Sequence, residues 1–419
     1  MKRQGTWEES PPAPRMKRHE QSDFLRREHA RGRRPIGTYR LRLWALTTIV
    51  SALSCAPAVR GPAMQVPPEQ DGPAAVVSGV RDLGALRFLG VIRGRDIGFS
   101  ARFRNRSVWV FGDTPLNYPG ADGSSWRSST WCWTRDFDAR DGLSDLNEPL
   151  DSNDTPGEFL PFTKEEQEYN AVHNRDTLPA DERSRWGLWP GPLAVDPATG
   201  KAIVFYSKVF SKVGPWAFED VGHSIAVWDD PAHRPVRPQV RPDAEEPTLL
   251  FPKGDFPTIG GAVCADGWIY AYGCRREGVG FDCILARVTF ADALTRSAWR
   301  FFTGDGRWSD DWHDAVPVMK GAPMLSVHWN RHLRRYLAVY STPLTNTIEI
   351  RTAEQPEGPW SASRVVATGR APIDKETWDY CGMAHAELAR GNGRVEYITY
   401  LRGTGFLSSE MRLVEVTFK

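Results

Sequence analysis

The sequence predicts an all-β protein folded as a five-bladed β-propeller, preceded by a signal segment and a short linker. The chain of 419 residues contains 17 Trp, 37 Gly and 32 Pro, which favours short strands joined by tight turns. No window shows a sustained 3.6-residue apolar period, as long helices would. From residue 81 onward, a small-residue strand, a turn, an aromatic-rich strand and further strands recur in units of about 65 residues.

The repeated units define the predicted blades. Small residues on each first strand suit a crowded central axis, and Trp or Tyr on the second strand fills the space between blades. Radial repetition of small antiparallel sheets is typical of a propeller, whereas a β-sandwich does not need five matching units. The predicted strands lie in residues 95–134; 188–196, 202–206 and 223–228; 259–264, 268–272 and 283–289; 324–329, 335–340, 347–351 and 360–364; and 382–387, 395–400 and 411–418.

The two ends of the propeller are expected to meet. The chain ends on what reads as the third strand of the fifth blade, and residues 81–88 are predicted to supply the fourth strand. Residues 56–80 are rich in Pro, Ala and Gly and read as a linker. The predicted domains are therefore a signal segment at 1–55, a linker at 56–80 and the propeller at 81–419.

An apolar run at residues 43–53 follows Arg40 and Arg42 and ends at Ser54 and Cys55. The run is too short to span a bilayer and has the layout of a secretory signal. It resembles a bacterial lipoprotein signal, in which Cys55 would be lipidated and become the new N-terminus. Because the segment before it is unusually long, initiation at Met16 or later is an alternative start. We expect a monomer exported to the periplasm or cell surface and anchored by lipid to the outer membrane.

Charge and cysteine content restrict the function. Of 53 basic and 52 acidic residues, 12 basic and 5 acidic ones lie in residues 1–42, which leaves 41 basic against 47 acidic in the main body. A slightly acidic body gives a nucleic-acid partner no electrostatic support. No cysteine spacing resembles a zinc site. One or two disulfides are expected after export, with Cys274 and Cys283 placed to close a hairpin; buried thiols are the alternative.

Two aspartates flank the first predicted hairpin. Asp96 lies near the start of its first strand, and Asp113 follows the alternating return strand at residues 107–111. An up-and-back hairpin returns the chain to the edge that it left, so both carboxyls are predicted at one mouth of a sheet. Glycosidic-bond hydrolysis needs such a pair, one carboxyl to protonate the leaving oxygen and one to activate water. The alternative is structural: Asp96 pairs with Arg93 or Arg95, and Asp113 caps a turn.

Several motifs together resemble domain-of-unknown-function family 4185 over about residues 81–419. They are Phe-Gly-Asp-Thr at 111–114, Trp-Asn-Arg-His-Leu-Arg-Arg-Tyr at 329–336, the segment 350–361 with its Ala-x-x-Pro-x-Gly-Pro-Trp element, and residues 412–418. The resemblance implies a five-bladed propeller related in architecture to glycoside hydrolase families 43, 32 and 62. Some members of the family are endo-D-arabinanases, grouped as glycoside hydrolase family 183. The Pro- and Gly-containing element is expected to present Trp360 for packing between blades.

The resemblance implies the same catalytic pair as the residues do, Asp96 and Asp113. We assign Asp96 as general base and Asp113 as general acid, with the reverse assignment as the alternative. Family 43 enzymes take their acid from a Glu on the third blade's inner strand, but residues 258–265 carry no carboxylate, so hydrolysis would rest on the Asp pair. We expect no required cofactor. A structural calcium is a weaker expectation, because a fifth-blade His approaches such an ion in family 43, and His385 is the candidate here.

Candidate substrate-binding residues come from predicted loops and inner strands. Exposed Trp faces stack on sugars, although a propeller Trp more often packs between blades, and an inner-strand His is often a hydrogen-bonded core residue. Long loops often carry function, which draws attention to the insertion at residues 155–189, but its run at residues 164–168 reads as a solvated face. The candidates are Trp189, Trp308, Trp312, His328 and His385.

These observations predict an exported glycosidase that acts on a carbohydrate, with furanoside (arabinan-type) glycans as the leading substrate class and inversion as the mechanism. A non-catalytic surface propeller that binds glycan or a protein is the alternative. A glycosidase acting on pyranosides is the third hypothesis.

Overall fold

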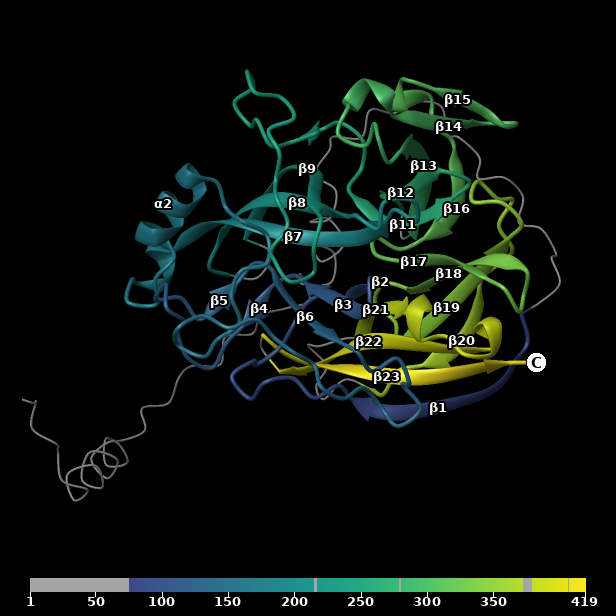
Figure 1. Cartoon of the computed structure of the whole chain (residues 1–419), viewed down its shortest axis with the longest axis horizontal. Coiled ribbons are helices and arrows are strands. Elements are labelled where there is room, and N and C mark those ends of the chain that lie inside the picture. Colours follow the sequence, from purple (N-terminus) through teal and green to yellow (C-terminus); the bar gives the residue numbers. More distant parts are fainter. Residues whose placement is uncertain (1–74, 215–216, 279, 372–378, 406) are drawn as a thin grey trace, which may run out of the picture. The chain divides into compact units, whose positions relative to one another are not determined.

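A computed structural model describes residues 75–214, 217–278, 280–371, 379–405 and 407–419. The described chain is all-β apart from short helical segments, and its sheets are arranged in a ring (Figure 1). The predicted signal segment with Cys55, and nearly all of the predicted linker, lie outside the described residues. Within those ranges, no helix has the length and apolar character needed to cross a bilayer.

The first two blades lie beside each other through their first strands. Blade one has the order β2-β3-β6, and a short ribbon, β4 with β5, extends from it. Blade two has the order β10-β9-β8-β7, so that the chain moves outward from β7. Their bounds are β2 (Phe99–Phe103), β3 (Arg106–Phe111), β4 (Thr114–Pro115), β5 (Trp126–Arg127), β6 (Thr130–Thr134), β7 (Ser184–Val195), β8 (Ala202–Lys212), β9 (Phe218–Trp228) and β10 (Phe251–Pro252).

Blades three and four continue the ring through β11 and β17, which lie next to each other. Blade three runs β11-β12-β13-β14-β15, with β16 also paired to β13, and blade four runs β17-β18-β19-β20. Their bounds are β11 (Ile259–Ala265), β12 (Trp268–Glu277), β13 (Gly280–Thr289), β14 (Arg300–Gly304), β15 (Arg307–Ser309), β16 (Pro317–Gly321), β17 (Ser326–Asn330), β18 (Arg335–Ser341), β19 (Thr347–Ala353) and β20 (Arg364–Thr368).

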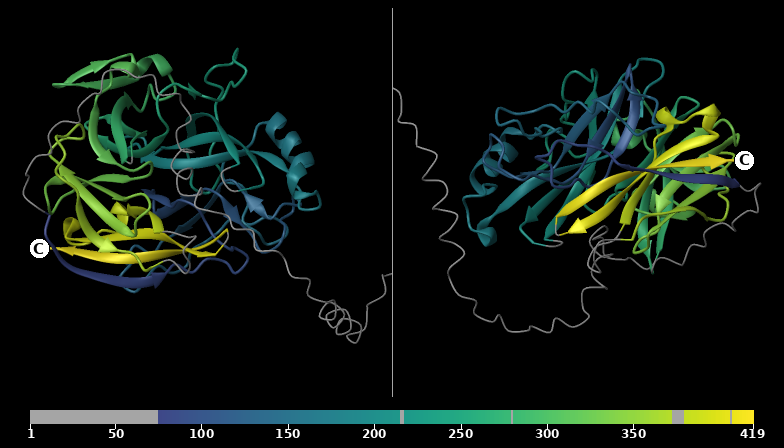
Figure 2. Two further views of the ribbon diagram at one scale, coloured as in Figure 1. Left: turned by 180° about the vertical axis from the view of Figure 1, so that it is seen from behind. Right: turned by 90° about the horizontal axis from the view of Figure 1, so that it is seen from below.

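Blade five joins the two ends of the propeller, as predicted. Its order is β1-β23-β22-β21, with β1 (Val77–Ala85), β21 (Asp379–Ala384), β22 (Val395–Gly405) and β23 (Ser408–Phe418). Figures 1 and 2 show β1 lying along the C-terminal strand β23. The closing strand begins at Val77, earlier than the predicted residue 81, because β23 extends to Phe418 and the antiparallel register pairs Val77 with it.

Aromatic side chains on the second strand of each blade are buried, as the sequence predicts. They pack in the interior and between neighbouring sheets; the Tyr272 hydroxyl, for example, donates to the Pro356 carbonyl of the next blade at 2.6 Å. Trp360 is also buried and packs against Tyr272, with ring centroids 6.2 Å apart. The buried second-strand aromatics are Trp109, Tyr206, Tyr272, Tyr340 and Tyr400.

The structure differs from two local predictions. The last strand of blade four is β20 at Arg364–Thr368 and not residues 360–364, because Trp360 turns into the core. The run at residues 164–168 begins the helix α2 (Lys164–His173), which is not fully solvated. Glu166 is buried and pairs with Arg237 at 2.6 Å and Lys208 at 2.8 Å. The other helical segments of the described residues are single turns at Ala180–Glu182, Arg296–Ala298, Trp312–Asp314, Ala386–Leu388 and Gly391–Gly393.

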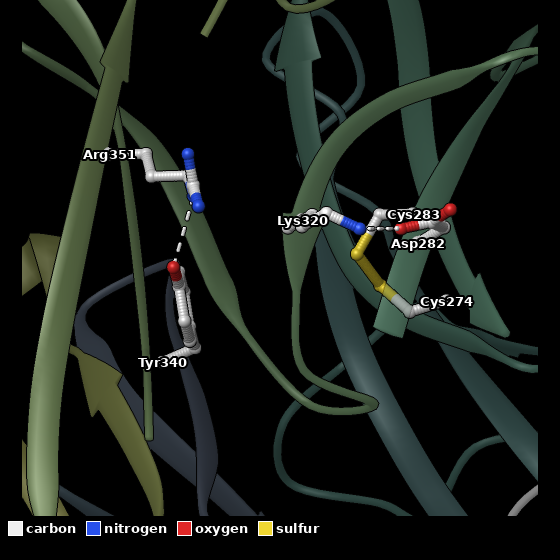
Figure 3. The surroundings of a disulfide bond; sticks show 6 residues. All are labelled: Cys274, Asp282, Cys283, Lys320, Tyr340 and Arg351. Atoms are coloured by element: carbon white, nitrogen blue, oxygen red, sulfur yellow. Dashed lines mark hydrogen bonds and ion pairs between the residues drawn. A yellow bond between two sulfur atoms is a disulfide. The ribbon is translucent and has the colours of Figure 1, made fainter. Parts of the chain in front are cut away.

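One disulfide closes the hairpin in blade three. Cys274 on β12 and Cys283 on β13 are register partners, and Asp282 beside them pairs with Lys320 of β16 at 2.9 Å (Figure 3). This is the disulfide expected from the sequence. The other described cysteines, Cys132, Cys264 and Cys381, are free thiols.

Small residues on the first strands are required by close packing at the axis. A Cβ at Gly260 on β11 would lie 1.6 Å from the Pro323 carbonyl oxygen, and one at Gly98, just before β2, would lie 2.5 Å from the Met411 methyl carbon. The first contact is with backbone, which cannot move without shifting blade four.

We therefore expect Gly260→Ala to destabilise the protein by at least about 1–3 kcal/mol, the usual cost of overpacking a core. Gly90→Ala is the control, because nothing lies within 4 Å of a Cβ there. Denaturant unfolding measures both variants. An unfolding midpoint for Gly260→Ala equal to that of the wild type would contradict the packing described above.

Candidate active site

The β2–β3 hairpin brings Asp96 and Asp113 together through the main chain. The Asp96 N–H donates to the Asp113 carbonyl, and the Gly112 N–H donates to the Asp96 carbonyl, each at 2.8 Å. These bonds extend the antiparallel register that pairs Phe99 with Val110. Both aspartates therefore lie at the same end of the hairpin.

Asp96 is not paired with the arginines near it in sequence. Arg95 is buried and forms a salt bridge with Glu148 at 2.5 Å, and the Arg93 side chain donates to the Leu407 carbonyl at 3.2 Å. The Asp96 carboxyl instead accepts hydrogen bonds from the Ile97 N–H at 2.9 Å and from the Tyr380 hydroxyl. The structural alternative for Asp96, an ion pair with Arg93 or Arg95, is wrong.

The backbone is strained directly beside Asp96 and its partner Tyr380. Ile97 has φ 61° and Cys381 has φ 55°, values that L-residues rarely adopt and that are least favourable for a β-branched side chain. Such strain costs about 1–3 kcal/mol per residue and concentrates at functional sites. The two neighbouring strained residues are therefore a reason to look for function here.

Asp113 is held by two tryptophans. Its Oδ1 accepts from the Trp126 indole N–H at 2.9 Å and from the Trp189 indole N–H at 3.0 Å. Trp126 lies on β5 and Trp189 on β7, so blades one and two both position this carboxyl. The turn is capped by Thr114, whose hydroxyl donates to the Gly112 carbonyl at 2.9 Å. The side chain of Asp113 is thus oriented by indoles, and the expected alternative of a simple turn cap is wrong.

The surroundings of the two carboxyls differ. Both side chains are partly exposed, so solvent reaches them. Burial raises the pKa of Asp96, and the charge of Asp113 raises it further, to about 6. Burial also raises the pKa of Asp113, but the Arg185 charge and the two indole donors oppose this rise. The surroundings therefore stabilise the ionised carboxylate more at Asp113 than at Asp96, so the two aspartates are suited to different roles.

His385 packs in the protein interior. Its Nδ1 lies 2.6 Å from the Ser100 hydroxyl and its Nε2 lies 2.7 Å from the Thr399 hydroxyl, while its ring stacks on Trp109 at 4.0 Å. Burial lowers its pKa to about 3, so the ring is neutral. Both ring nitrogens have hydrogen-bond partners in the protein, as expected for a core histidine. These partners are side-chain hydroxyls and not backbone groups.

His328 lies on β17 and bonds to Glu396 of blade five, with Nε2 3.1 Å from the carboxylate. Burial favours the neutral ring, but the Glu396 carboxylate outweighs it and raises the pKa of His328. Within the described chain, neither histidine forms a hydrogen bond with Asp96 or Asp113. The described residues also contain no group of three or more His, Cys, Asp or Glu that could hold a metal ion, at His385 or elsewhere.

Of the tryptophans predicted to contact substrate, the structure brings only Trp189 to the Asp pair in the described chain. Trp308 lies on β15, the outermost strand of blade three, and packs against Phe302 and under the Arg287 guanidinium. Trp312 stacks on His313 in a single helical turn after that strand. The sequence places Trp308 and Trp312 in one loop before blade four. In the structure this segment forms the outer edge of blade three and the helical turn that follows it.

Three residues at the site were missed by sequence reasoning: Trp126, Arg185 and Tyr380. Trp126 and Tyr380 donate to the two aspartates, and the Arg185 guanidinium lies 4.3 Å from the centre of the Trp126 ring. None lies in a motif. The only available signal was that Arg185 falls in the long insertion before the second inner strand.

The fold and this site together define a five-bladed β-propeller with two aspartates, unequal in environment, at one end of its first hairpin. The model of the family described as domain of unknown function (DUF4185) matches residues 226–393, so the resemblance to this family is confirmed for that part of the chain. The matched segment runs from the end of blade two into blade five and does not include Asp96 or Asp113. No curated protein matches the chain.

Solved structures with similar folds come from several organisms. A family 117 glycoside hydrolase from Zobellia galactanivorans is 11% identical with a TM-score of 0.46, covering 81% of this chain and 90% of that one. A GH43_1 enzyme from Xanthomonas citri is 14% identical with a TM-score of 0.44, covering 79% and 89%. The α-L-arabinofuranosidase of Podospora anserina, solved with cellotriose, is 9% identical with a TM-score of 0.43, covering 80% and 95%. At these values none of them bears on the chemistry of this chain.

The raised pKa of Asp96 predicts that removing its charge stabilises the protein. Because the folded-state pKa of about 6 exceeds the unfolded value near 4, stability is lost as pH rises through this interval. Asp96→Asn should therefore gain about 1–3 kcal/mol of unfolding free energy at pH 8, and the gain should disappear below about pH 4.

Asp151→Asn is the matched control with the opposite sign. Burial opposes ionisation of Asp151, but the Ala121 N–H and other donors outweigh it and lower its pKa to about 2. This variant should lose stability at pH 8. Denaturant unfolding at pH 4 and pH 8 measures both, and a destabilised Asp96→Asn at pH 8 would show that Asp96 is a structural carboxylate.

Proposed function

We propose that this protein is an exported glycoside hydrolase that cleaves furanoside (arabinan-type) glycans by an inverting mechanism carried by Asp96 and Asp113. The observation that supports this most is the pairing of the two aspartates at the end of the β2–β3 hairpin, where neither forms an ion pair among the described residues. Both residues are partly exposed to solvent. An inverting pair requires carboxyls about 6.5–9.5 Å apart, with room for a water molecule.

The electrostatics favour the reverse of the roles first assigned from the sequence. A general base must be ionised, and two indole donors and the Arg185 charge support the anion at Asp113. A general acid must hold a proton near neutral pH, and burial together with repulsion from Asp113 gives Asp96 a pKa of about 6. We therefore propose Asp96 as the acid that protonates the leaving oxygen and Asp113 as the base that activates water.

The substrate class rests on the family resemblance, since some members of DUF4185 are endo-D-arabinanases. The alternative function is a non-catalytic surface propeller that binds glycan.

Release of sugar from a panel of arabinans and galactans distinguishes hydrolysis from binding. Asp96→Asn and Asp113→Asn should each lower kcat by at least about 10²-fold, the low end of general acid or base contributions, while both proteins stay folded. Asp122→Asn is the control, because Asp122 is exposed and its partner Arg127 keeps a second carboxylate, Asp151. Glu148→Gln is unsuitable because it would leave Arg95 without its salt bridge. Equal activity in the wild type and both aspartate variants would rule out the mechanism, and inactivity on every glycan would favour the binding function.

The pH profile of kcat/KM tests the acid and base roles separately. Trp189→Phe removes an N–H donor from Asp113 and so raises the pKa of Asp113. If Asp113 is the base, the acidic limb moves to higher pH and the alkaline limb, set by Asp96 near pH 6, stays in place.

Tyr380→Phe is the complementary variant, because the lost hydroxyl raises the pKa of Asp96. The alkaline limb should then move to higher pH and the acidic limb should not move. If each variant instead moves the other limb, Asp96 is the base and Asp113 the acid.

Export and lipid anchoring are also proposed. The Cys274–Cys283 disulfide suits an oxidising compartment, and Cys55 stands where a lipoprotein signal is cleaved. Cys55→Ser should move the protein from the membrane fraction to the soluble periplasmic fraction, as followed by immunoblotting after cell fractionation. Cys132→Ser, a buried thiol, is the control. Unchanged membrane association of Cys55→Ser would exclude lipidation at this residue.

A further inference from the structure

Arg185 has an unusual position beside the Asp pair. Its guanidinium lies on the face of Trp126, 4.3 Å from the ring centre, and the indole N–H of that same Trp126 is bound to Asp113. The Arg185 charge acts on Asp113. Among the described residues, no carboxylate lies within ion-pair distance of Arg185, and no atom accepts a hydrogen bond from its guanidinium. Trp126 thus contacts both groups, Arg185 through its ring face and Asp113 through its indole N–H.

Neighbouring arginines are bonded differently. Arg127, which follows Trp126 in the chain, is buried and pairs with Asp122 and Asp151, each at 3.1 Å. Arg183, two residues before Arg185, pairs with Asp176 at 3.2 Å. Each of these serves a structural purpose that its carboxylate partners define. Arg185 has no such partner among the described residues, and its partial burial lowers its pKa.

The donors of Arg185 are open to solvent. The side chain is partly exposed, and its nitrogen atoms are not among the buried polar atoms that lack a partner. A guanidinium in this position stays charged and offers five N–H donors in a rigid plane. It is therefore available to an acceptor that enters the site from solvent.

The insertion before β7 holds Arg185 in place from both sides. The Tyr169 hydroxyl of α2 lies 2.7 Å from the Ser184 hydroxyl, just before Arg185. The Asn170 side chain of α2 accepts from the Trp186 N–H at 2.8 Å and donates to the Trp186 carbonyl at 3.0 Å. A helix that fixes both sequence neighbours of an unpaired arginine presents that arginine in one place, as binding of a ligand requires.

We propose that Arg185 forms an anion-binding subsite next to Asp113, and that the glycan carries a carboxylate or a sulfate ester on a sugar bound there. A planar guanidinium recognises such groups through two parallel hydrogen bonds, which neutral hydroxyls cannot match in strength. Trp126 contributes the stacked support, and α2 contributes the positioning. The subsite rests on the proposed function for its substrate, but binding at it does not require hydrolysis.

A role as a simple counter-ion for Asp113 is the competing explanation. A counter-ion would contact its carboxylate directly, whereas Trp126 and Trp189 occupy the hydrogen-bond positions on Asp113 Oδ1. A counter-ion would also alter the pKa of Asp113 without distinguishing charged from neutral ligands. The experiment therefore compares ligands.

Isothermal titration calorimetry of the Asp96→Asn protein measures binding without turnover. The probes are neutral arabino-oligosaccharides, the same oligosaccharides bearing glucuronate, and sulfated ones. We expect one of the two anionic sets to bind about tenfold or more tightly than the neutral set, with affinity that falls as salt rises. Adding Arg185→Gln should remove this advantage and leave neutral binding within about twofold, and Arg185→Lys should restore part of it.

Arg175→Gln is the matched control, because it removes the same charge from the end of α2, where Arg175 donates to the Ala171 carbonyl. It should change no affinity. Equal binding of anionic and neutral probes, no binding of any probe, or an equal loss for all probes in Arg185→Gln would overturn the subsite. If the wild-type protein hydrolyses no glycan but binds anionic probes in a way that depends on Arg185, the proposed hydrolase activity is refuted and the anion-binding subsite stands. Hydrolysis of neutral and anionic glycans at equal rates, with no anionic preference in binding, would refute the subsite and keep the hydrolase.

Discussion

The reciprocal backbone hydrogen bonds between Asp96 and the Gly112–Asp113 turn are the constraint on which the site depends. They hold both aspartates at one end of the first hairpin. Different neighbouring blades then supply the hydrogen-bond donors to the two carboxyls. Blade five supplies Tyr380 to Asp96, and blade two supplies Trp189 to Asp113. Closure of the ring by β1 and β23 is thus needed for the chemistry as well as for stability, because it keeps blade five beside blade one.

Most of the fold could be predicted from the sequence because its signals are local. Small residues on first strands and an aromatic on each second strand report packing that every blade repeats, as Gly260 and Tyr272 illustrate. Predictions were wrong where tertiary contacts override a local pattern. Trp360 reads as part of a strand but turns into the core, and Glu166 reads as solvated but pairs with Arg237, whose position 71 residues away no local pattern reveals.

The site was only partly predictable for the same reason. Asp96 and Asp113 were found because one hairpin joins them, and Trp189 because it begins an inner strand. Tyr380 approaches from the last blade, and Arg185 depends on a helix whose short polar sequence gave no clear periodic signal. The unequal environment of the two carboxyls, which supports the reversed acid and base roles, arises entirely from these distant residues.

The anomeric configuration of the first sugar released is the measurement that tests the two-aspartate account most directly. ¹H NMR of the reaction on a cleaved glycan distinguishes the anomers before they equilibrate. We predict inversion, because Asp113 activates a water molecule that attacks the anomeric carbon from the face opposite the leaving oxygen protonated by Asp96. Retention of configuration would require one carboxylate to act as a nucleophile and would contradict the account.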